Sequence, residues 1–135
     1  MTLFDNAENS ILDLIFFTTA LPNFTTAINV TLHTTSPGDA GDSTTNEAAY
    51  GGYVATGVAT LRNVSDWTVT ANSVSNAIAI TFPTVTGEPL TDITHVAISG
   101  DANAGIAWQV LDAPITPVVG DTPQFAIGAL TFTID

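Results

Sequence analysis

Positive charge is almost absent from this sequence. Its 135 residues include a single Lys or Arg, which is Arg62, against 13 Asp and Glu, so the formal net charge is −12. Proteins that bind nucleic acids neutralise phosphates with Lys and Arg, and attraction to an anionic membrane surface also depends on basic residues. We therefore expect neither a nucleic acid nor a membrane as a partner.

Cysteine is absent too, which excludes disulfides, zinc sites built on thiolates and a thiol nucleophile. No apolar run approaches the roughly 20 residues that a membrane-spanning helix needs. The first residues carry no basic region ahead of an apolar stretch, so we expect no ordinary secretory signal.

Residues suited to catalysis are few. His33 and His95 are the only histidines, whereas a zinc site of the ordinary type takes three or four ligands, so we interpret each as a side chain on the polar face of a strand. The Gly-x-Ser-x-Gly, Walker and dinucleotide-binding motifs are absent, and Schiff-base chemistry has no Lys. We expect no catalytic, cofactor-binding or metal-binding residues and no enzyme, although paired glycosidase carboxylates would leave no sequence signature.

Three acidic residues share one long polar loop over residues 36–49, namely Asp39, Asp42 and Glu47. Carboxylates and backbone carbonyls are the ligands that Ca²⁺ takes in proteins, but the spacing matches no EF-hand loop. We favour a solvated acidic turn over a Ca²⁺ site. Connections of this length are often functional, so the loop is a candidate contact surface.

The chain is long enough for one domain, residues 1–135, and 45% of its residues are hydrophobic, so it can bury a core. A capping pattern at Asp5 and Glu8 precedes apolar residues at helical spacing. This predicts an α-helix over about residues 5–19, with Ile11, Leu14, Ile15 and Phe16 on its apolar face. Such a helix packs on the domain core or docks on a partner.

Beyond Pro22 the hydrophobic period changes to two, and turn residues recur between short alternating segments. The predicted strands cover residues 27–34, 50–62, 66–71, 76–82, 94–99, 106–110, 125–127 and 130–134. This pattern predicts a mainly β fold, an antiparallel β-sandwich or jelly roll with one N-terminal helix.

Several motifs in order carry a resemblance to a known family. Leu-His-Thr-Thr-Ser-Pro-Gly from Leu32 is followed by Asn-Glu-Ala-Ala-Tyr-Gly-Gly-Tyr, which ends at Tyr53. A Trp-led strand, Ser-Asn-x-x-x-Ile-x-Phe-Pro, Thr-His-x-x-Ile and Gly-Ala-Leu-x-Phe-Thr come later. Together they resemble a family of small tailed-bacteriophage virion proteins often labelled tail fibre proteins. Relatives carry Arg near the Tyr-led strand, whereas residues 54–57 here are Val-Ala-Thr-Gly.

The resemblance implies a virion structural protein on the outside of a phage particle. A fibre shaft needs length and repeats, and this chain shows neither, so our first expectation is a capsid decoration or cement protein. The alternative is a tail-fibre or baseplate component that binds a host glycan or receptor, with Trp67 or Trp108 as sugar contacts.

We expect the partners to be the major capsid protein or tail proteins, and we expect self-association, with a trimer as the candidate form. Avidity among several copies would strengthen weak single contacts. The interface residues that we predict come from the helix and the long loop: Ile11, Leu14, Ile15, Phe16, Asp39, Asp42, Glu47, Tyr50 and Tyr53.

Overall fold

The structure is a computed structural model that describes residues 2–4, 7 and 27–133. The helix predicted over about residues 5–19 lies, apart from Ala7, outside the described residues. The predicted contact residues Ile11, Leu14, Ile15 and Phe16 also lie outside them.

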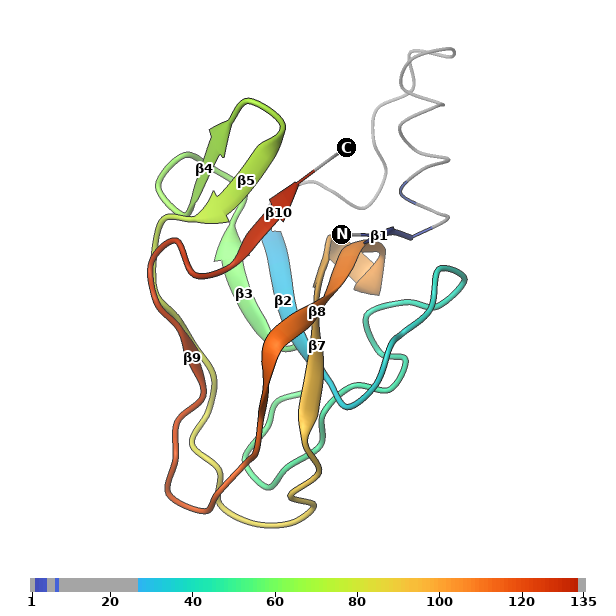
Figure 1. Ribbon diagram of the computed structural model, residues 1–135, viewed down its shortest axis with the longest axis vertical. Coiled ribbons are helices and arrows are strands. Elements are labelled where there is room, and N and C mark those ends of the chain that lie inside the picture. Colours follow the sequence, from blue (N-terminus) through green and yellow to red (C-terminus); the bar gives the residue numbers. More distant parts are fainter. Residues whose placement is uncertain (1, 5–6, 8–26, 134–135) are drawn as a thin grey trace.

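Ten strands form three antiparallel sheets in the described part of the chain (Figure 1). The largest has the order β1-β8-β7-β2-β3, a second the order β10-β5-β4, and a third pairs β6 with β9. The strands are β1 (Thr2–Leu3), β2 (Ala27–His33), β3 (Val58–Leu61), β4 (Trp67–Thr70), β5 (Ser73–Asn76), β6 (Ile80–Thr81), β7 (Ile93–Ser99), β8 (Gly105–Ile115), β9 (Gln124–Phe125) and β10 (Thr131–Thr133). A short 3₁₀ helix, η1 (Asp101–Asn103), joins β7 to β8.

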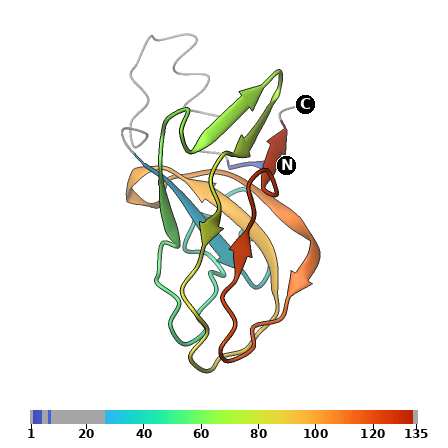
Figure 2. The ribbon, with the colours of Figure 1, turned by 90° about the vertical axis from the view of Figure 1, so that its left-hand side faces the viewer.

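The five-stranded sheet is built around β2 and β7, whose alternation places apolar side chains on one face. Val30 pairs with Ile98 and Leu32 pairs with Val96 across the two strands. These residues are at most 7% exposed and belong to the hydrophobic core. The β4–β5–β10 and β6–β9 sheets lie across that face (Figures 1 and 2).

The core fills the space between these layers. Ile80 and Phe132 of the smaller sheets and Phe82, which follows β6, are each 1% exposed and belong to the same cluster as the large sheet. The ring of Phe82 meets that of Phe125 edge to face at 6.1 Å between centroids, a favourable arrangement for aromatic pairs. The prediction of a mainly β, antiparallel fold is confirmed, and its assignment to a sandwich or jelly roll stays a prediction.

The second face of the β2–β7 pair is buried as well, although its residues look polar in the sequence. Thr31, His33 and Ser99 are fully buried there. The loop after β2 covers this face, since the ring of His33 is hydrogen-bonded to the carbonyl of Thr45 at 2.9 Å and Ser43 donates to the carbonyl of Asn103 at 3.3 Å. The central strands are thus covered on both sides.

Several strand predictions need correction. The strand predicted over residues 50–62 is confirmed only from Val58, because the preceding stretch forms turns at Gly52 and Gly57, whose φ angles are +94° and +70°. Residues 76–82 divide between the end of β5 and the two-residue β6. Strand β1 was not predicted, and β8 extends well beyond the predicted residues 106–110.

Within the described ranges, no helix has the length and hydrophobicity to cross a membrane.

Candidate functional site

The predicted contact residues of the long loop divide into buried anchors and exposed acids. Tyr50 is 3% exposed, and its hydroxyl donates to the carbonyl of Pro83 at 3.1 Å. The Tyr50 and Tyr53 rings meet edge to face at 5.2 Å, and Tyr53 stacks on Phe82 at 6.3 Å. The two tyrosines therefore extend the core into the loop, and Tyr50 in particular is not available to a partner.

Glu47 belongs to the same anchor. Its Oε1 accepts hydrogen bonds from the Tyr53 hydroxyl at 2.9 Å and from the backbone N–H of Thr56 at 2.8 Å. The Tyr53 oxygen in turn accepts from the backbone N–H of Leu32 at 3.1 Å. Burial raises the pKa of the Glu47 carboxyl and of the Tyr53 hydroxyl above their ordinary values. The chain from Glu47 through Tyr53 to Leu32 ties the loop to β2.

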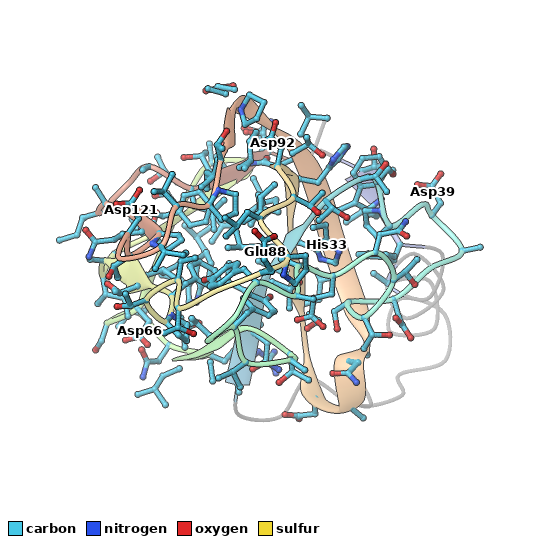
Figure 3. The ribbon with its side chains drawn as sticks, turned by 90° about the horizontal axis from the view of Figure 1, so that it is seen from below. His33, Asp39, Asp66, Glu88, Asp92 and Asp121 are labelled. Carbon is cyan, nitrogen blue, oxygen red and sulfur yellow. The ribbon has the colours of Figure 1, made fainter. Side chains whose placement is uncertain are left out.

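Asp39 and Asp42 are the accessible members of the predicted set. Asp42 Oδ1 accepts from the hydroxyl of Thr44 at 2.6 Å and from its backbone N–H at 2.8 Å, and these bonds lower the pKa of Asp42. Asp39 is exposed at the outer edge of the loop (Figure 3). In the part of the chain that the structure describes, no three His, Cys, Asp or Glu gather as metal ligands would.

His33 lies on the polar face of β2, as predicted, but the structure buries that face. Its side chain is fully buried, with Nε2 hydrogen-bonded to the Thr31 hydroxyl at 2.8 Å and Nδ1 to the Thr45 carbonyl at 2.9 Å. Burial lowers its pKa, and His95, its partner across β2 and β7, lowers it further. A neutral ring satisfied on both nitrogens is a structural residue, so His33 holds the loop against the sheet.

Neither tryptophan forms an exposed aromatic platform of the kind that stacks on sugars. Trp67 is 8% exposed, and its indole N–H donates to the Thr60 hydroxyl at 2.9 Å. Trp108 is half-buried on β8, with its ring 5.6 Å from that of His95. These contacts place both rings in the packing of the domain.

An apolar groove does open between the β4–β5 hairpin and the large sheet. Ile28, Ile98 and Ile106 come from the sheet, and Val69 and Val74 come from the hairpin. Its volume is about 600 Å³. The other residues around it are Arg62, Asn63, Val64, Trp67 and Thr68. We call this feature the apolar groove.

A smaller hollow of about 240 Å³ continues the apolar groove toward β1 and β10. The two share Val69, Val74, Ile98 and Ile106. Two valines on the hairpin side face solvent, since Val64 is 91% exposed and Val69 is 74% exposed. Exposed valines beside a floor of isoleucines form an apolar surface, and the described residues that line it include no Asp or Glu.

The apolar groove has no clear signature in the sequence. The pattern of residues 66–71 predicts an ordinary short strand, and Asn76 of β5 falls in the strand predicted over residues 76–82. The alternation of Trp67 and Val69 gives the only signal, and it describes a core-facing strand equally well. The groove arises because the hairpin extends past the sheet that it packs on, which depends on tertiary structure.

Comparison with models of known protein families finds a match to this chain. Its residues 2–133 match the family model described as podophage GP4 fiber I protein gp80. No curated protein matches the chain significantly. A match to a fibre family supports the alternative expectation of a tail-fibre component over the first expectation of a capsid decoration protein. Because it spans nearly the whole chain, the protein belongs to the podophage GP4 fiber I protein gp80 family and is a structural component of a bacteriophage virion.

Proposed function

We propose that the protein is a globular module of a podophage tail-fibre assembly on the outside of the particle, and that it joins neighbouring virion proteins through the apolar groove. The observation that carries this proposal is the groove itself, an accessible apolar surface on a domain with few other features of a binding site. The family match supports the location in a fibre.

The composition of the groove favours a protein partner over a glycan. Sugar sites combine exposed aromatic rings with several polar groups, whereas valine and isoleucine dominate here. The net charge of −12 also disfavours long-range attraction to other acidic surfaces. Apolar contacts are short-ranged and little affected by salt, so they suit an acidic protein that must stay attached to the particle.

We also propose that the facing sheets form a small β-sandwich. The support is the shared core, to which the large sheet contributes Leu32 and Val96 and the smaller sheets contribute Ile80 and Phe132. Opposed sheets with interdigitating inner faces define such folds.

Cryo-electron microscopy of purified particles tests the location. We expect density for this domain in the tail appendages at low copy number. Many copies over the head, or no copies in washed particles, would refute the proposed function.

A matched pair of variants in the phage genome tests the groove. Val69→Asp places a carboxylate in the groove, whereas Val110→Asp makes the same change at a 61% exposed valine on β8 outside it. Mass spectrometry of purified particles should find the first variant depleted and the second retained. Equal retention of both would show that the groove makes no contact in the particle.

A further inference from the structure

A second apolar feature lies in the connection between β8 and β9. Val118 and Val119 are adjacent in sequence and are 53% and 58% exposed. Asp121, also exposed, follows them after Gly120. We call Val118, Val119 and Asp121 the valine knob.

The valine knob is held in a defined shape. The N–H of Asp121 donates to the carbonyl of Val118 at 2.9 Å and closes the turn. Two further bonds of 2.8 Å, from Gly120 N–H to Val85 O and from Val85 N–H to Asp121 O, fix the turn to the segment after β6. The φ of Gly120 is +98°, which glycine adopts without strain. A preformed turn loses little conformational entropy when it docks.

The valine knob and the apolar groove lie at opposite ends of the molecule. The β4–β5 hairpin stands at the top of the long axis in Figures 1 and 2, and the β8–β9 connection lies at the bottom in both views. Figure 3, seen from below, shows Asp121 at the outer edge of that end. A knob at one end and a groove at the other allow copies to join in series.

We propose that the valine knob of one copy seats in the apolar groove of a second copy, so that the chains associate head to tail. This rests on the proposed function, in which the apolar groove is a protein contact. A groove of about 600 Å³ is within the roughly 300–1,000 Å³ of pockets that enclose drug-sized ligands, so it has room for two valine side chains. A heterologous contact between opposite ends leaves a free knob and a free groove after each addition.

Charge supports a second copy as the occupant. Copies that each carry a net charge of −12 repel one another over most approaches. Arg62 is the only Lys or Arg in the chain, and it lies at the apolar groove, where the described residues of the lining include no Asp or Glu. The knob brings Asp121 beside its two valines. Docking the knob in the groove therefore brings the carboxylate of Asp121 toward Arg62 of the neighbouring copy.

The contact predicts a specific pattern of self-association. Sedimentation velocity of the purified full-length protein should show oligomers that grow with concentration. Added NaCl should strengthen them, because salt screens the repulsion between acidic copies. Val69→Asp in the groove and Val119→Asp in the knob should each weaken association at least about tenfold, since either buries an unpaired carboxylate. Val110→Asp is the control and should associate as the wild type does.

Mixing the two variants is the decisive test. Val69→Asp keeps an intact knob and Val119→Asp keeps an intact groove, so an equimolar mixture should form dimers that do not grow further. Thermal unfolding of each variant confirms that it folds. Since the substituted valines are 74% and 58% exposed, their midpoints should stay near that of the wild type.

Three outcomes overturn the proposal. A wild type that remains monomeric at high concentration assigns the apolar groove to another occupant, such as another virion protein or residues 8–26 of the same chain. A Val119→Asp variant that associates normally excludes the knob. A mixture without dimers excludes pairing between the two sites. None of these results bears on the presence of the protein in the fibre, which microscopy of particles tests separately.

Discussion

Asn76 connects three segments of the smaller sheets and provides a quantitative test of the fold. The residue is 1% exposed at the end of β5. Its Nδ2 donates to the carbonyls of Ile78 at 2.7 Å and Ala126 at 2.8 Å, and its Oδ1 accepts from the N–H of Leu130 at 2.9 Å. One buried amide therefore satisfies three backbone groups, which lie just before β6, just after β9 and just before β10.

We expect Asn76→Ala to destabilise the protein by about 3–5 kcal/mol. Each hydrogen bond contributes about 1 kcal/mol net, and a buried backbone group left without a partner costs about 1–3 kcal/mol. Alanine removes all three bonds. Domains of this kind are stable by about 5–15 kcal/mol, so the variant should fold but unfold at a much lower denaturant concentration.

The matched control is Asn29→Ala. Asn29 lies on β2, is half-buried, and makes one longer bond of 3.3 Å to the carbonyl of Gly100, so we expect a loss of about 0.5–1 kcal/mol. Urea unfolding followed by tryptophan fluorescence measures both. If the loss for Asn76→Ala is below about 1.5 kcal/mol, or no larger than for Asn29→Ala, the reasoning about the buried amide is wrong.

Three further predictions concern the loop and its anchors. The pKa of His33 is lower in the folded protein than in the unfolded chain, so the unfolded chain binds the proton first as the pH drops. The free energy of unfolding should therefore fall as the pH drops through 6.5, by up to about 1.4 kcal/mol per pH unit. Between pH 7.5 and 5.5, the urea midpoint should decline less in His33→Gln than in the wild type. An equal decline in both proteins would contradict this. Tyr53→Phe leaves the Leu32 N–H without its partner, so it should lower the free energy of unfolding by about 1–3 kcal/mol. Proteases should also cut the loop between β2 and β3 faster, and an unchanged cleavage rate would argue against Tyr53 as an anchor of the loop. Gly57→Ala should lower the melting temperature, because φ is +70° and the new Cβ would overlap the carbonyl of Val30; an unchanged melting temperature would show that the turn relaxes freely.

The sequence predicts the central strands well, and the limits of that prediction have a physical cause. The apolar residues of β2 and β7, such as Leu32 and Val96, alternate clearly, and the structure confirms both strands. Thr31 and His33 alternate with them as polar residues, and period-two reasoning assigns that face to solvent. A loop that arrives later in the chain buries it, and no local pattern records that contact.

The loop and the groove both show that sequence patterns do not predict which residues tertiary contacts will bury. Tyr50 and Tyr53 look like exposed aromatics in a glycine-rich segment, yet stacking on Phe82 draws Tyr53 toward the core. Val64 and Val69 look like ordinary turn and strand residues, yet they remain exposed because the hairpin projects. In both cases burial is decided by which distant segment packs there.

The pairing of strands far apart in the sequence has a consequence for folding during synthesis. Thr2 pairs with Trp108 across β1 and β8, and Val74 pairs with Phe132 across β5 and β10. The edge of β5 that pairs with β10 therefore stays open until residues 131–133 have left the ribosome, and an open strand edge invites pairing with another chain. Because such non-local contacts form slowly, we expect nascent or truncated chains that lack β10 to aggregate more readily than chains that contain it.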